Sequence, residues 1–129
     1  MAIQDEYREK AKEALDKLQQ QIDELRVQAD LAQAEVRDRL EKAVDALRER
    51  QRDVRKRLDD ASETGADTWK SAATQVEDAV DNLGDTFSKL AQEVQTAAGA
   101  GGAAAKKGYE AFLEEWKKEV AERKALLAK

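Results

Sequence analysis

Acidic side chains at helical spacing are the residues of this chain that could do acid–base chemistry or bind a metal. Asp5, Glu9 and Glu13 recur every four residues, and Glu114 stands next to Glu115. Carboxylate bundles that hold iron also use His ligands, and glycosidases need two carboxylates in a cleft. The chain has no His and no Cys, which removes the usual zinc ligands, the imidazole base and the thiol nucleophile. We therefore expect no catalytic residue, no metal site and no cofactor, and a protein that is not an enzyme.

A basic run at residues 48–57 could bind an anionic ligand. Arg48, Arg52 and Arg55 share one helix face at spacings of four and three. Nucleic-acid-binding domains are usually basic overall, whereas this chain has a net charge of −5 and no aromatic residue within the run. We expect no nucleic-acid binding, and pairing of these arginines with acidic residues further along the chain instead. The expected partners are Glu77, Asp78, Asp81 and Asp85.

Half of the aromatic residues lie near the C-terminus, among lysines. Aromatic residues at helical spacing usually anchor a packed core, and this interpretation is favoured here. The alternative is that an aromatic stripe flanked by lysines lies in a membrane interface or against a partner. The residues of that candidate contact are Tyr109, Phe112, Trp116, Lys117 and Lys118.

The elements that must position these residues are long helices. The chain has no Pro, and 40% of its residues are charged, with both signs present, which is typical of long helices and coiled coils. Between Ile3 and Ala61 there is no Gly, and an apolar stripe recurs at an average of about 3.6 residues. This pattern predicts one nearly straight helix over about residues 3–63, roughly 90 Å long at 1.5 Å per residue. Such a helix cannot bury its stripe alone.

Two shorter helices are predicted after it. The first covers about residues 67–98, with apolar residues alternating at steps of four and three. A glycine-rich linker at 99–102 follows, which lacks the Gly-Lys-Ser/Thr ending of a phosphate loop, and the last helix covers about 103–128. We expect a single all-α domain over 1–129, in which the long helix packs against these two antiparallel helices. Either an extended helical hairpin or a three-helix coiled-coil bundle fits the pattern.

The narrow, Ala-rich stripe favours self-association to complete the burial. We expect a homo-oligomer, either an antiparallel dimer or a higher assembly. The residues expected to serve helix packing and self-association are Leu18, Ile22, Leu25, Val36, Leu40, Leu47, Leu58, Trp69, Val76, Val80, Leu83, Phe87 and Leu90.

The order of several short segments between residues 3 and 94 carries further information. The segments are Ile22-Asp23-Glu24-Leu25, Ala29-Asp30, Ala34-Glu35, Leu58, Ala61, Trp69-Lys70, Val76-Glu77-Asp78-Ala79 and Leu83. This order resembles a family of small bacterial coiled-coil proteins commonly labelled stress-response proteins. Val80 stands where that family often has a second Trp, and residues 99–129 look like an extension. The resemblance implies induction under stress, and it supplies no catalytic residues.

The sequence leaves two functions open. The first is a non-enzymatic coiled-coil interaction or scaffold protein, associated with stress and bound to itself or to an unknown protein. The alternative is an amphipathic, conditionally folding protein that binds lipid surfaces or protects the cell during stress or desiccation. No apolar run approaches the roughly 18 residues of a membrane span, and no hydrophobic segment follows the acidic N-terminus. We therefore expect a cytoplasmic protein.

Overall fold

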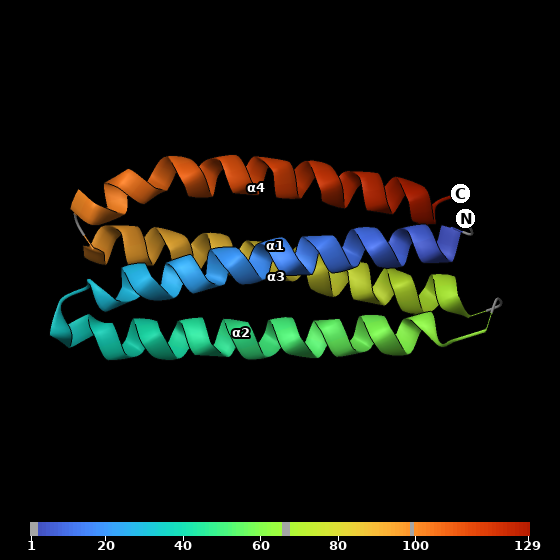
Figure 1. Ribbon diagram of the computed structural model, residues 1–129, viewed down its shortest axis with the longest axis horizontal. Coiled ribbons are helices and arrows are strands. Elements are labelled where there is room, and N and C mark those ends of the chain that lie inside the picture. Colours follow the sequence, from blue (N-terminus) through green and yellow to red (C-terminus); the bar gives the residue numbers. More distant parts are fainter. Residues whose placement is uncertain (1–2, 66–67, 99) are drawn as a thin grey trace.

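The computed structural model is a bundle of four helices that run alternately up and down (Figure 1). It describes residues 3–65, 68–98 and 100–129, apart from the side chains at positions 98 and 100–105. The helices are α1 (Ile3–Asp30), α2 (Ala34–Ser62), α3 (Trp69–Ala98) and α4 (Ala100–Leu127). The predicted all-α class is confirmed.

The single helix predicted over 3–63 is wrong, because the chain reverses at residues 31–33 and forms α1 and α2 instead. The backbone of Gln33 leaves the helical region, with φ −59° and ψ 147°. Folding back lets α1 and α2 bury their apolar stripes against each other and against α3. The bundle therefore has four helices in its described part, in place of the predicted three.

The turn between α1 and α2 is held by hydrogen bonds that the sequence pattern does not predict. The Arg37 guanidinium donates from Nε and Nη2 to the carbonyl of Ala32, at 3.2 and 3.1 Å. The amide groups of Val36 and Arg37 donate to the Gln33 carbonyl, while the Gln33 side chain makes no capping hydrogen bond. Arg37 thus satisfies a carbonyl that a helix C-terminus leaves without a partner.

The boundaries of the later helices also differ from the prediction. α3 begins at Trp69, and the predicted start at residue 67 lies outside the described residues. α4 begins at Ala100, so most of the predicted linker 99–102 is helical, and Gly99 lies outside the described residues. The alanines that follow are strong helix formers, and they favour helical extension into the linker. Of the arrangements considered for the last helix, the structure takes the one that turns back onto α3.

The core lies where the four apolar stripes meet. α1 and α3 each contact all three other helices and meet across the bundle, whereas α2 and α4 make no contact in the described part. Buried polar groups also link the helices: the Gln51 amide of α2 donates to the Leu15 carbonyl of α1 at 3.0 Å, and the Tyr7 hydroxyl of α1 donates to the Ala73 carbonyl of α3 at 3.2 Å. The pair α1 and α3 therefore lies at the centre of the fold.

Gly84 allows α3 and α4 to approach closely. It is buried, and a Cβ atom at this position would overlap the indole ring of Trp116. Gly108 of α4 is different, because it is exposed and a Cβ there would meet no atom within 4 Å. Packing therefore excludes a larger residue at Gly84, whereas there is room for one at Gly108.

Substituting these two glycines should change stability in opposite directions. Gly84→Ala should lower the free energy of unfolding by about 1–3 kcal/mol, because overpacking against Trp116 outweighs the gain in helix propensity. Gly108→Ala should raise it, by up to about 1 kcal/mol, because only the propensity gain applies. Urea denaturation followed by circular dichroism measures both. Equal stabilisation by the two substitutions would contradict the close packing at Gly84.

Candidate functional site

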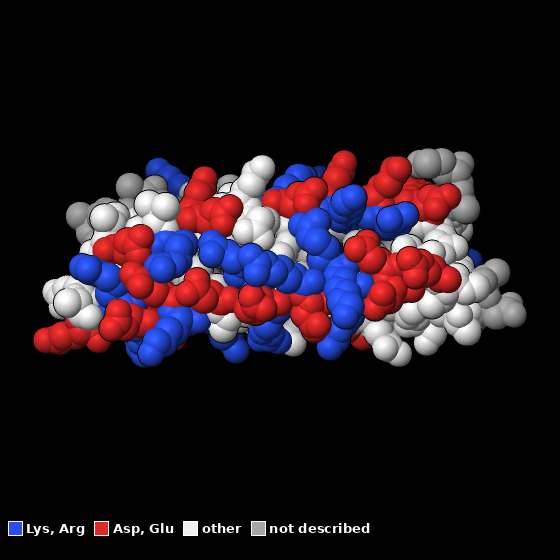
Figure 2. Space-filling model, turned by 60° about the horizontal axis from the view of Figure 1, so that its bottom comes forward, with Lys and Arg blue, Asp and Glu red and all other residues white. Residues whose placement is uncertain are grey.

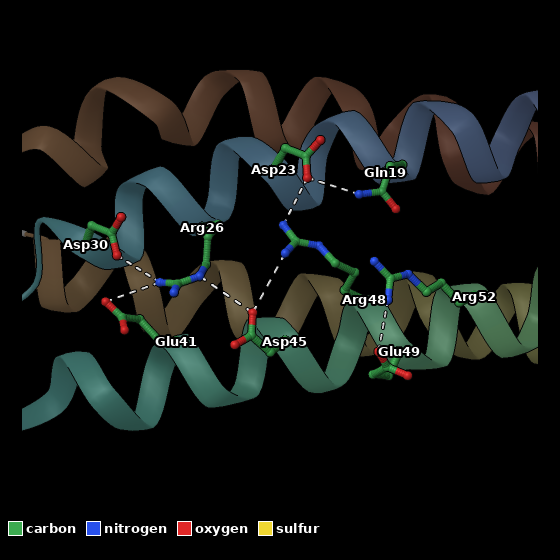
Figure 3. Close-up of polar contacts among 9 residues, drawn as sticks. All are labelled: Gln19, Asp23, Arg26, Asp30, Glu41, Asp45, Arg48, Glu49 and Arg52. Carbon is green, nitrogen blue, oxygen red and sulfur yellow. Dashed lines mark hydrogen bonds and ion pairs between the residues drawn. The ribbon is translucent and has the colours of Figure 1, made fainter.

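Interleaved charges cover the face of the bundle formed along α1 and α2. Figure 2 shows Lys and Arg beside Asp and Glu along the length of the molecule on this face. Arg26 of α1 lies within 2.8 Å of Asp30 and 3.2 Å of Glu41, and its Nε lies 3.6 Å from Asp45 (Figure 3). One guanidinium therefore joins the end of α1 to the beginning of α2, close to the turn between them.

The arginines of the basic run pair mainly with α1 or within α2. Arg48 lies 3.0 Å from Asp23 of α1 (Figure 3), and Arg55 lies 2.8 Å from Asp16 of α1. Arg52 pairs with Glu49 of its own helix at 3.1 Å. The partners predicted for the run, Glu77, Asp78, Asp81 and Asp85, are therefore wrong: the turn at 31–33 brings the acidic side of α1 alongside the run, which one continuous helix would not allow.

Two of those predicted acidic partners on α3 pair with α4 instead. Asp81 lies 3.2 Å from Lys124, on the surface. Glu77 accepts two hydrogen bonds from Arg123, at 2.6 Å from Nε and 3.2 Å from Nη2. Both of these latter side chains are 1% exposed. The structure thus contains a buried, bidentate ion pair between α3 and α4.

The buried ion pair lies beside two aromatic side chains, Trp116 at Arg123 and Tyr7 at Glu77. The Arg123 guanidinium lies over the Trp116 ring, 5.9 Å from its centroid. Burial raises the pKa of the Glu77 carboxyl, and the hydrogen bonds and charge of Arg123 offset only part of that rise. Burial and then the charge of Glu77 also raise the pKa of the Tyr7 phenol. Desolvation is therefore the dominant electrostatic effect in this part of the core.

Most aromatic residues of the candidate contact lie inside the folded chain. Tyr109 and Trp116 are buried, and Phe112 is half-buried. The Phe87 ring packs edge to face against Tyr109 and Phe112, with centroids 5.7 and 5.5 Å apart. Lys117 and Lys118 are exposed on α4. The structure thus separates these two lysines from the aromatic rings, which it brings together with Phe87.

The residues predicted to serve packing and self-association also lie between helices of one chain. All of them are buried except Val36 and Trp69, which are half-buried. Contact between two copies through these residues would therefore require helices to exchange. The buried members are Leu18, Ile22, Leu25, Leu40, Leu47, Leu58, Val76, Val80, Leu83, Phe87 and Leu90.

The buried ion pair is not among the pairings expected from the sequence, although the sequence contains a signal for it. Arg123 follows Trp116 and Val120 at steps of four and three, so it occupies a position of the apolar stripe. Glu77 likewise stands four residues after Ala73 and seven before Gly84, on the face of α3 that α4 covers. A charged residue at a stripe position on each of two helices predicts a buried pair between them.

No family model matches the chain, and neither the search of curated proteins nor the search of solved structures finds a match. Within residues 3–65, 68–98 and 100–129, no three Asp or Glu side chains gather in a way that could hold a metal ion. In the same part of the chain, no helix is both long and apolar enough to cross a bilayer.

Breaking the buried pair should destabilise the bundle more than replacing it. Arg123→Ala should lower the free energy of unfolding by about 3–5 kcal/mol, because it leaves the Glu77 carboxylate buried without its cation. The double variant Glu77→Leu with Arg123→Met should stay within about 1 kcal/mol of the natural chain or exceed it. Chemical denaturation followed by circular dichroism measures both. A double variant as unstable as Arg123→Ala would show that the pair itself stabilises the fold.

Both tyrosines should ionise at a higher pH in the folded chain than in the unfolded one. Burial, with a smaller effect of Glu24, raises the pKa of Tyr109 to about 12, and that of Tyr7 rises as well. Since folding raises these pKa values, their stabilising contribution is complete below about pH 10, the unfolded value, and decreases as the pH rises. Tyrosinate absorbance should therefore increase together with the loss of helix at alkaline pH. A tyrosine that titrates near its unfolded value in the intact bundle would contradict this burial.

Proposed function

We propose that this protein is a non-enzymatic, helical interaction and scaffold protein that acts through its charged outer faces. The observation that carries the proposal is the division of side chains in the bundle. The apolar stripes and most aromatic rings pack within one chain, and the surface over α1 and α2 is covered by interleaved ion pairs (Figures 2 and 3). The charge pattern along the bundle can select which partner binds, and in which register and orientation.

We place this function in a stress response, which the resemblance of residues 3–94 implies. We place it in the cytoplasm because the sequence has no apolar run of the length of a membrane span. The proposed partners are a second copy of the chain and a further protein. Partner choice by charge pattern favours specificity and association rate over strong affinity. The exposed ion pairs themselves contribute little to stability, because solvent screens them. They are therefore free to exchange partners without unfolding the bundle.

The lipid-binding alternative needs an apolar face that is free to enter a membrane interface. In the bundle, that face of α4 carries Tyr109 and Trp116, which are only 3% exposed. Binding to lipid through α4 would require this helix to leave α1 and α3, with loss of the buried pair of Arg123. This cost favours the interaction protein over the lipid-binding one.

Circular dichroism of a dilution series, with and without anionic vesicles, separates the two functions. The interaction protein should be highly helical in buffer, and vesicles should leave its helicity unchanged. A matched variant, Lys117→Glu with Lys118→Glu, removes two exposed cations of α4 without touching the core. It should behave like the natural chain in both media. Low helicity in buffer that rises with vesicles, and rises less in the variant, would overturn the proposal in favour of lipid binding.

A further inference from the structure

The turn between α1 and α2 contains no residue that stops a helix. Residues 27–36 include neither Gly nor Pro, whereas Gly65 stands in the connection between α2 and α3. Gln33 is the residue with extended backbone angles, and its side chain makes no capping hydrogen bond. Gln and Ala are good helix formers. The local sequence therefore favours a continuous helix at the position where the chain reverses.

The apolar stripe also continues in phase through the turn. Ala29, Ala32 and Val36 follow one another at steps of three and four, which places them on one face of an uninterrupted helix. In the bundle, Ala29 and Ala32 are buried, and Val36 is half-buried. The same residues can thus face a core in either arrangement of the backbone.

The side-chain contacts specific to the turn are few. They are the two hydrogen bonds from Arg37 to the Ala32 carbonyl and the ion pairs that Arg26 makes with Glu41 and Asp45. The turn also has short-range backbone hydrogen bonds, such as that from the Ala32 amide to the Ala29 carbonyl. In a continuous helix, the Ala32 carbonyl would accept its hydrogen bond from the Val36 amide instead. Opening the turn therefore leaves no buried carbonyl without a donor.

Two large apolar side chains are exposed beside the turn. Val27, near the end of α1, and Leu31, in the turn itself, are each 61% exposed. In an open form, this is the stretch where a long helix would leave one bundle and enter the next.

We propose that the turn at residues 31–33 opens, so that α1 and α2 form one helix over about residues 3–62, and that two chains then exchange α1. The α1 helix of each chain would pack against α2, α3 and α4 of the other. The two long helices would run antiparallel past each other at residues 27–36, where Ala29, Ala32 and Val36 of both chains share the packing face. This inference rests on the self-association in the proposed function, and it names the segment that is exchanged.

The partner in the exchange is a second copy of this chain. When α1 leaves, it exposes a surface of α2, α3 and α4 that is complementary to α1 itself. Arg48 pairs with Asp23, Arg55 pairs with Asp16, and the Gln51 amide donates to the carbonyl of Leu15. Each of these contacts joins α1 to α2, so each can form again between two chains. The exchanged dimer therefore keeps the charge and apolar complementarity of the closed bundle.

Ala34→Pro distinguishes the closed chain from the open one. Ala34 is the first residue of α2, a position that proline favours. The residue before it, Gln33, already has the extended conformation that a proline requires of its predecessor. In the continuous helix, the same proline would lie in the interior and break it. Arg37→Ala is the matched variant, and it should favour the open chain, because it removes hydrogen bonds that exist only in the closed turn.

Chemical cross-linking reports the exchange directly, since the natural chain has no Cys. One full-length chain carries Asp16→Cys and a second, size-tagged chain carries Arg55→Cys. The two are unfolded, refolded together at high concentration and treated with a bismaleimide, because the contact between Arg55 and Asp16 spans a long arginine side chain that a direct disulfide would not bridge. Exchange brings the two cysteines together from different chains, so a covalent dimer of mixed composition should form. Adding Ala34→Pro to both chains should lower its yield at least about tenfold, and adding Arg37→Ala should raise it.

Circular dichroism confirms that each variant is folded, and light scattering gives its mass. Absence of the mixed dimer in the natural background would overturn the exchange of α1, and so would an equal yield with Ala34→Pro. If chains with the natural turn are dimeric without the mixed cross-link, the exchange is wrong while the proposed self-association stands. If all chains are monomeric at high concentration, both fail.

Discussion

The fold depends on one constraint: each helix carries an apolar stripe that it cannot bury by itself. Most helical stability in proteins comes from tertiary packing of such a face. The chain meets the constraint by reversing between successive helices, so that four helices of similar length lie along one axis (Figure 1) and bury their stripes against one another. α1 and α3 each contact all three other helices, so the core is built on this pair.

The other features of the molecule follow from how closely the helices must approach. Gly84 makes room for Trp116 between α3 and α4. Arg123, two helical turns further along the same interface, lies too deep to reach water and pairs with Glu77. On the outside, the acidic side of α1 lies against the arginines of α2, which gives the surface its interleaved charges. The proposed function uses this outer pattern, and the proposed exchange uses the complementarity of α1 and α2.

The sequence predicts which residues are buried better than it predicts where the chain turns. Spacing alone identifies Leu18, Ile22, Leu47 and Phe87 as packing residues, and the structure buries all four. The turn at 31–33 escapes prediction because it has no Gly or Pro, and because the stripe continues through it. Tertiary packing there overrides local helix propensity. The wrong pairing of Arg48 and Arg55 follows from this one error, since the turn decides which acidic helix lies beside them.

Small-angle X-ray scattering of the monomer, collected as it elutes from a sizing column at low concentration, tests whether α1 and α2 fold back on each other. The four-helix bundle should be a particle little longer than its longest helix, which at 1.5 Å per residue is about 45 Å for α3. A monomer with a maximum dimension near the roughly 90 Å of an unbroken helix over 3–63 would show that α1 and α2 do not fold back on each other, and would contradict the four-helix bundle.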